Sequence, residues 1–353
     1  MVKVAFVLPV PNSKIIGGYK VTYEYANFLA EHGLDVTIIY NAHNGDNSKH
    51  LPKAIVYSLR YRIGKYGPKW FPLDPKIHRV VRKNYDNESF TGYDVVIATA
   101  TETAPFVNKA RCNKVYFIQG YEDWDGRTDE EVDRTYRYDM TKVVISKWLQ
   151  RKVKEASGEE AIYIPDGINR KIFYEKIKFQ SRKKHTLSGL YHDDPRKGCD
   201  VLLKVIYRLR KKYPDFEAYL FGYPEKPKNW PEWIHYTHKA TPEQVADVLN
   251  QSRAFLCPSR QEGFGLTGLE SIFCGCVLVT TDCYGIREYA DEDNSCMCRI
   301  DDEDSMYSNV CSLFENDEIC RKKREKCIRI ITEFDGETSK KKFMDTVLNG
   351  IKK

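Results

Sequence analysis

Residues 257–288 read CPSRQEGFGLTGLESIFCGCVLVTTDCYGIRE, and this stretch decides the fold. The apolar run 254–256 before it predicts a buried strand, and residues 269–278 predict a helix that leads into another strand. A strand, a glycine-rich turn and a helix N-terminus together make an anion site, because backbone amides point outward and the helix dipole favours negative charge. Glu262 and Glu270 lie on either side of this turn. A ligand with both phosphates and hydroxyls, such as a nucleotide-sugar, suits the arrangement.

Two other interpretations explain some of the same residues. Thr267-x-x-Glu270 fits a capping box, which explains these two residues but not the glycines or Glu262. Gly263-x-Gly265-x-x-Gly268 fits a dinucleotide fingerprint, with Asp282 at the end of the next strand. Against the fingerprint, residues 258–262 separate the strand from the first glycine, which should stand at the strand's end.

Residues 258–270 resemble the signature of retaining glycosyltransferases of family 4, with the order Pro-Ser-x-x-Glu-Gly-Phe-Gly-Leu-x-x-Leu-Glu. Four motifs in family order are far more specific than one. The other three are Gly17-Gly18 before a helical pattern over 21–31, Ile164-Pro165-Asp166-Gly167-Ile168-Asn169, and Arg196-Lys197-Gly198.

The resemblance implies an α/β protein of the GT-B fold, in which two Rossmann-like, doubly wound parallel-sheet domains face each other across a cleft. Residues 1–165 would form an N-terminal acceptor-side domain, and residues 166–335 the domain that binds the nucleotide-sugar donor. Residues 336–353 would form a crossover helix that packs back on the first domain. The charged stretch 163–184 breaks the alternation of strands and helices and is expected to be the interdomain linker.

Short β-branched runs predict buried parallel strands on both sides of this linker, with helical patterns between several of them. The runs before the linker are 2–7, 36–40, 95–98, 115–118 and 142–145, and those after it are 186–190, 217–221, 254–257 and 277–281.

The resemblance also assigns roles at the donor site. Glu262 would contact the donor sugar, Lys197 the diphosphate, and Glu270 the ribose hydroxyls, since a carboxylate accepts two hydrogen bonds from a diol. Gly17 and Gly18, in the first loop, would let the backbone approach the donor phosphate or the acceptor. The turn that meets the phosphates comprises Gly263, Phe264, Gly265, Leu266 and Thr267.

The sequence departs from the family pattern at two places. Leu190 stands where the family usually has an arginine, and Arg196 is the candidate to supply the missing guanidinium. The family's histidine after the fourth strand is absent from the stretch 117–124. Gln119 is the candidate to hydrogen-bond the sugar or the reaction centre in its place, and Glu122 and Asp123 are candidates to bind acceptor hydroxyls.

The expected activity is that of a retaining hexosyltransferase-type glycosyltransferase in cell-surface polysaccharide or glycoconjugate synthesis, with a glycan, lipid-linked or other hydroxyl acceptor. In the family's front-face transfer, the leaving phosphate deprotonates the acceptor. No metal and no cofactor are expected beside the nucleotide-sugar. The alternatives are a nucleotide-sugar-binding protein that has lost turnover and an NAD-type dinucleotide oxidoreductase.

Bulk properties agree with a two-domain cytoplasmic protein. The chain has 353 residues, is 42% hydrophobic and carries a net charge of +6. Residues 1–9 are expected to form a first parallel strand rather than a secretory signal, and no apolar run in the sequence reaches about 18 residues. The 11 cysteines are expected to be reduced and mostly buried. Basic and aromatic residues interleave over 57–83, a pattern that suits anionic lipid head groups, a lipid-diphosphate acceptor, an acidic glycan or simply a charged acceptor loop with buried aromatics. Peripheral association with an anionic membrane is one hypothesis from this pattern, and no nucleic-acid motif accompanies it.

Overall fold

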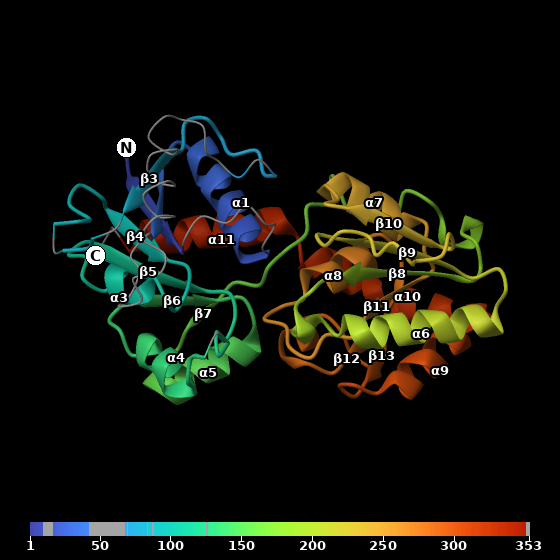
Figure 1. The fold of residues 1–353 in the computed structure, drawn as a ribbon. Helices are drawn as coiled ribbons and strands as arrows, with labels where there is room; N and C mark the ends of the chain where they lie inside the picture. Colours follow the sequence, from blue (N-terminus) through green and yellow to red (C-terminus); the bar gives the residue numbers. More distant parts are fainter. Residues whose placement is uncertain are drawn as a thin grey trace. The chain divides into compact units, whose positions relative to one another are not determined.

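The computed structural model describes residues 1–9, 17–41, 68, 70–82, 84–86, 88–124 and 126–350. The chain divides into two compact α/β units, drawn in Figure 1. The first unit comprises Met1–Pro165 and Ser339–Lys353, and the second comprises Asp166–Thr338. The boundaries expected from the sequence lie after residues 165 and 335.

The first unit contains a parallel sheet with the strand order β3-β2-β1-β4-β5-β6-β7. The chain winds outward from β1 through β2 to β3, then returns to β4 on the other side of β1. In Figure 1, α1 and α11 lie on one side of the sheet, and α4 and α5 on the other. The elements are β1 (Lys3–Leu8), α1 (Gly17–Glu31), β2 (Asp35–Asn41), β3 (His78–Arg82), β4 (Val95–Ala98), α3 (Ala104–Val107), β5 (Asn113–Ile118), α4 (Asp129–Tyr136), β6 (Thr141–Val144), α5 (Lys147–Ser157), β7 (Ile162–Tyr163) and α11 (Gly336–Asn349).

The second unit repeats this design with the strand order β10-β9-β8-β11-β12-β13, again all parallel. Its winding direction changes between β8 and β11, and ligands of open α/β sheets bind beyond the carboxyl ends of strands at such a switch point. The elements are β8 (Thr186–Tyr191), α6 (Cys199–Lys212), β9 (Glu217–Gly222), β10 (Ile234–His238), α7 (Pro242–Asn250), β11 (Ala254–Cys257), α8 (Leu266–Phe273), β12 (Val277–Thr281), β13 (Cys296–Cys298), α9 (Glu303–Glu315) and α10 (Asp317–Glu333).

Helix α6 shows why these residues form this layer. Val201, Leu202, Val205, Ile206 and Leu209 recur at helical spacing and are all buried in the core of the second unit. Its C-terminal turn carries basic residues, which suit the negative end of the helix dipole. The apolar stripe therefore fixes the face that α6 buries, and the helix begins at Cys199, on the loop that follows β8.

The nine predicted strands are all present, and 95–98, 254–257 and 277–281 have the expected bounds. Four further strands, β3, β7, β10 and β13, were not predicted. Each lies at an edge of its sheet. Edge strands are covered less completely than central ones, so they need no continuous apolar run and give a weak sequence signal.

The prediction of a linker over 163–184 is wrong for most of that stretch. Tyr163 lies in β7 of the first unit, which ends at Pro165, and residues 166–184 belong to the second unit. Arg182 is only 6% exposed, and its guanidinium donates to the carbonyl oxygens of Ile177 at 3.0 Å and Ser252 at 2.7 Å. The many charged residues in this stretch suggested a solvent-exposed segment, but the buried guanidinium of Arg182 hydrogen-bonds buried carbonyl groups instead.

The two ends of the second unit pair with each other. A parallel bridge joins Ile168 to Asp335, the Ile168 amide donates to Phe334 O at 2.9 Å, and the Gly336 amide donates to Ile168 O at 3.1 Å. A Cβ on Gly167 would lie 2.7 Å from the Cα of Gly336, so only glycine allows this approach. The motif around Gly167 therefore serves a backbone contact.

Helix α11 returns the chain to the first unit. Its Phe343 is fully buried and contacts Phe6, Tyr25 and Phe117, with ring centroids 6.2, 4.6 and 5.1 Å apart. These partners come from β1, α1 and β5. The last helix is thus part of the core of the first unit.

The 11 cysteines are all free thiols, and all but Cys112 are buried. None of the helices in the described ranges has the length and apolarity that a membrane crossing requires.

Candidate functional site

Two loops meet at the switch point of the second unit. One follows β8 and contains a short 3-10 helix, Pro195–Lys197, before α6 begins. The other follows β11 and leads into α8. At Gly198, φ is +63°, and a Cβ would lie 2.0 Å from the carbonyl oxygen of Pro258. Glycine is required there because the two loops are in backbone contact.

The structure brings Lys197 and Glu262 together, one from each loop. Lys197 Nζ lies 2.7 Å from Glu262 Oε1, and Ser259 Oγ donates to the same oxygen at 2.8 Å. Glu262 is only 9% exposed. Burial acts to lower the pKa of Lys197, but the Glu262 carboxylate outweighs it and raises that pKa above the ordinary value. The pair therefore presents an ammonium group that stays charged at neutral pH.

The capping-box interpretation of Thr267 and Glu270 is wrong. Helix α8 begins at Leu266, its N-cap is Gly265 in the left-handed region, with φ +84°, and no side chain caps it. Thr267 and Glu270 therefore lie inside the helix. The Glu270 side chain is buried, with 4% exposure, within the first turns of α8.

The glycines of this turn make room for close packing. Tyr289 Oη donates to Gly265 O at 2.6 Å, and a Cβ on Gly268 would lie 2.5 Å from that hydroxyl. A Cβ on Gly285 would lie 1.9 Å from Gly263 O. Burial raises the pKa of Tyr289 well above its ordinary value, so its hydroxyl stays a donor. The turn's backbone is thus held from behind by the segment after β12.

This geometry does not fit a dinucleotide fingerprint. Strand β11 ends at Cys257, well before Gly263, whereas the fingerprint places its first glycine at the strand's end. Asp282 would have to bind a ribose, but its carboxylate is paired with Arg287 at 2.6 Å.

Arg196, the other predicted cation, pairs within its own loop. Its Nη2 lies 2.5 Å from Asp194 Oδ2, and its backbone amide donates to Asp194 Oδ1 at 2.9 Å. The hydrogen bond from this guanidinium lowers the pKa of Asp194. Leu190, at the family's arginine position, lies in β8.

In the first unit, Gly17 and Gly18 were expected in the loop before the first helix. The structure shows instead that they are the first two residues of α1. Gln119 follows β5, and its Nε2 donates to Thr22 Oγ1 at 3.3 Å. A Cβ on Gly18 would lie 3.6 Å from the Gln119 amide group. The structure therefore places Gln119 against the first turn of α1.

Glu122 and Asp123 differ in environment. Glu122 Oε2 accepts a hydrogen bond from the Thr101 amide at 2.8 Å, and burial raises the pKa of Glu122. Asp123 is exposed. Glu122 is thus tied to the loop after β4, and Asp123 is the more accessible of the two.

Residues 57–67, 69 and 83 of the basic and aromatic stretch 57–83 lie outside the described residues. Within the described part, Trp70 and Phe71 pack against Tyr23, with ring centroids 5.7 and 5.5 Å apart. These two aromatics therefore belong to the packing of α1, while Arg79 is exposed on β3.

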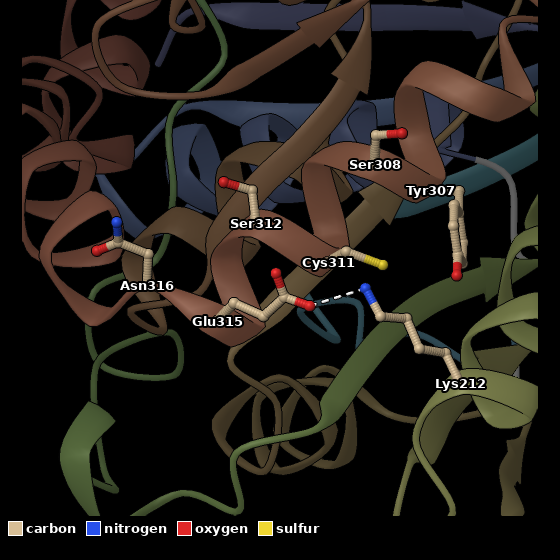
Figure 2. A pocket seen from close by; sticks show the side chains of 7 residues that line it. All are labelled: Lys212, Tyr307, Ser308, Cys311, Ser312, Glu315 and Asn316. Carbon is tan, nitrogen blue, oxygen red and sulfur yellow. Dashed lines mark hydrogen bonds and ion pairs between the residues drawn. The ribbon is translucent and has the colours of Figure 1, made fainter.

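In the described part of the chain, no three His, Cys, Asp or Glu side chains are grouped to hold a metal ion. A pocket of about 440 Å³ lies between the end of α6 and α9, and Figure 2 shows the side chains that line it. Its Lys212 is paired with Glu315 at 2.7 Å, and the residues that line it include none of the predicted site residues. This pocket is therefore separate from the Lys197–Glu262 pair.

Ser259 and Tyr289 contribute to the site but were not among the predicted site residues. Ser259 stands three residues before Glu262 in the Pro-Ser-x-x-Glu motif, so its spacing gave a signal. Tyr289 has no local signal, because it reaches Gly265 only through the tertiary fold.

Residues 183–316 match the family model described as "Glycosyl transferases group 1". This part of the second unit is therefore similar to the group 1 glycosyl transferases. The loops that carry Lys197 and Glu262 lie within the matched range.

Curated proteins also align with the chain over part of its length. Phosphatidyl-myo-inositol mannosyltransferase of Mycolicibacterium smegmatis is 23% identical over 189 residues, covering 50% of this chain and 49% of that protein. An uncharacterised glycosyltransferase of Methanocaldococcus jannaschii is 24% identical over 188 residues, covering 50% of each. The chain thus spans about half the length of the curated relatives it matches.

Solved structures match over nearly the whole chain and show that it has the GT-B fold. HepE of Anabaena, in complex with UDP-glucose, has a TM-score of 0.74 at 12% identity, covering 99% of this chain and 100% of that one. TarM of S. aureus, in a complex that includes UDP, has a TM-score of 0.73 at 12% identity and full coverage of both chains. The two parallel-sheet units therefore have the architecture of the GT-B fold.

Proposed function

We propose that this chain is a retaining glycosyltransferase of family 4 that moves a hexose from a nucleoside-diphosphate-sugar to a hydroxyl acceptor. The observation that carries the proposal is the Lys197–Glu262 pair at the switch point of a group 1 domain. The two similar structures that hold UDP or UDP-glucose favour a UDP-sugar as donor. A role in cell-surface polysaccharide or glycoconjugate synthesis is part of the same proposal.

The chemistry follows from charge development on the donor. Cleavage of the anomeric bond places negative charge on the leaving diphosphate, which the Lys197 ammonium and the amides at the start of α8 stabilise. Glu262 orients the lysine and contacts the sugar, and Glu270 holds the ribose. The leaving phosphate takes the acceptor proton on the same face, so the anomeric configuration is retained. The reaction then requires no metal and no further cofactor.

The acceptor side belongs to the first unit in this proposal. Gln119, beside the start of α1, hydrogen-bonds the sugar or the reaction centre, and Glu122 and Asp123 bind acceptor hydroxyls. The acceptor is a glycan or a lipid-linked group. Peripheral association with the inner face of an anionic membrane is a further part of the proposal, which flotation with anionic and neutral vesicles checks; binding to neither would contradict it.

The decisive experiment is a thermal-shift screen with UDP, GDP, TDP and NAD, followed by donor hydrolysis without acceptor. We expect UDP to raise the melting temperature and NAD to leave it unchanged. Release of UDP from a UDP-sugar distinguishes an enzyme from a protein that only binds, and the anomeric configuration of the product, read by NMR, tests retention. Stabilisation by NAD alone, or binding of UDP without release from any UDP-sugar, would refute the proposed activity.

A further inference from the structure

Arg260 contacts both loops of the site, although it lies outside the predicted set. Its Nη1 and Nη2 donate to the Asp200 carboxylate at 3.0 and 2.9 Å, and Nη1 also donates to Pro195 O. Its Nε donates to Asp301 Oδ1 at 2.8 Å. One guanidinium therefore holds the start of α6, the 3-10 turn before it and the segment before α9.

The backbone of Arg260 adds to this link. Its amide donates to Arg196 O at 2.6 Å, directly before Lys197. Arg260 itself lies two residues before Glu262. Arg260 thus contacts residues on both sides of Lys197 in one loop, namely Pro195, Arg196 and Asp200. In the other loop, Arg260 is itself a close neighbour of Glu262 in the sequence.

Two further observations show that the contact is specific. The Arg260–Asp200 pair has the bidentate geometry in which arginine binds carboxylates most strongly. Asp301 holds φ +61°, a conformation uncommon for residues other than glycine, and its carboxylate is 2.7 Å from Arg260 Nη2. A non-glycine residue in this region is held there by its surroundings.

We propose that Arg260 is a positioning residue that holds the Lys197 loop against the Glu262 loop in the arrangement that donor turnover requires. The inference rests on the proposed function, since the turnover concerned is that of the nucleotide-sugar. Arg260 acts through the loops and not through the substrate. Its loss therefore affects the transition state, where Lys197 meets full diphosphate charge, more than the binding of donor.

The test compares Arg260→Ala with Arg208→Ala in the full chain. Arg208 is a matched control, because it also bridges two carboxylates, Glu303 and Asp304, but on the surface between α6 and α9. In UDP-sugar hydrolysis, we expect Arg260→Ala to lower kcat at least tenfold with KM within about twofold, and Arg208→Ala to change neither. Arg260→Lys should recover only part of kcat, because an ammonium lacks the two-pronged geometry.

A double-mutant cycle with Asp200→Asn isolates the contact. We expect Asp200→Asn combined with Arg260→Ala to lower kcat no further than Arg260→Ala alone. Additive losses, or an Arg260→Ala enzyme with the kcat of the control, would overturn the inference.

Hydrogen exchange separates this inference from the proposed function. Peptides over 192–200 should exchange faster in Arg260→Ala than in Arg208→Ala, whether or not a donor has been found. Unchanged exchange overturns the link between the loops. Faster exchange in Arg260→Ala, found together with a wild-type chain that turns over no UDP-sugar, would support the link while refuting the activity it is proposed to serve.

Discussion

Lys197 and Glu262 are 65 residues apart in the sequence and 2.7 Å apart in the structure. Parallel strands bring them together, because β8 and β11 are neighbours and the loops that follow these two strands start at the same edge of the sheet. Neither residue stands alone: the lysine needs the carboxylate to stay charged where it is partly buried, and the carboxylate needs the lysine and Ser259.

Replacement of Lys197 by methionine should lower UDP-sugar hydrolysis about 100-fold or more, because the leaving diphosphate loses its cation. The same change at Lys204 is the control, since that lysine pairs with Glu303 on the surface, 3.8 Å away. Initial rates at saturating donor provide the measurement. Equal rates for both variants would show that Lys197 has no part in turnover.

Gly268→Ala should lower the free energy of unfolding by about 1–3 kcal/mol, because its Cβ would lie 2.5 Å from Tyr289 Oη. Tyr289→Phe removes that hydroxyl but leaves Gly265 O without its donor. The two changes together should therefore cost less than the sum of the single changes in urea titrations. Strict additivity would contradict this packing, and Gly17→Ala provides the control, because no described residue comes within 4 Å of a Cβ there.

The pair of Asp194 and Arg196 predicts an acid-sensitive contribution to stability. The pKa of Asp194 is lowered in the folded state, so its contribution is complete above the unfolded pKa of about 3.9 and is lost as the pH falls through the folded value. Asp194→Asn should be less stable than the wild type at pH 7, and the difference should shrink below about pH 4. Urea titrations at several pH values check this, with exposed Asp193→Asn as control; a gap that is independent of pH would count against it.

At the scale of the element, α11 shows how a helix outside the site supports the fold. Phe343→Ala should lower the free energy of unfolding of the first unit by about 3–5 kcal/mol, because the ring is fully buried among Phe6, Tyr25 and Phe117. The exposed Lys342→Ala, one position earlier, should have little effect. Denaturation followed by circular dichroism distinguishes the two variants, and similar midpoints would show that α11 does not contribute to this core.

The central strands and the helices could be predicted from the sequence, because buried strands appear as apolar runs and amphipathic helices as apolar residues repeated at helical spacing. The edge strands β3, β7, β10 and β13 could not, since one side of each has no neighbouring strand. The Glu262 loop was predictable from its motif, and the contact partners Arg260 and Tyr289 were not, because their roles depend on tertiary distance. The charged residues over 163–184 led to the wrong prediction of an exposed linker, because one of them, Arg182, is buried within the second unit.

At the scale of the whole molecule, each unit has its own sheet and core. We expect calorimetry to resolve two unfolding transitions, one for each unit. UDP should stabilise only the second unit, raising its free energy of unfolding by about 2.7 kcal/mol at a UDP concentration of 100 times Kd. Phe343→Ala identifies the other transition by lowering it. A single transition that moves as a whole with UDP would contradict this independence.

The bridge between Ile168 and Asp335 has a consequence for protein engineering. Since the Gly336 amide is 3.1 Å from Ile168 O, the second unit enters and leaves the rest of the chain at one point. It is therefore a cassette with adjacent ends, the arrangement that tolerates insertion best. Exchange of residues 168–335 between chains of this fold should combine one protein's donor preference with another's acceptor preference, with two adjacent junctions to rebuild, at Ile168 and at Asp335.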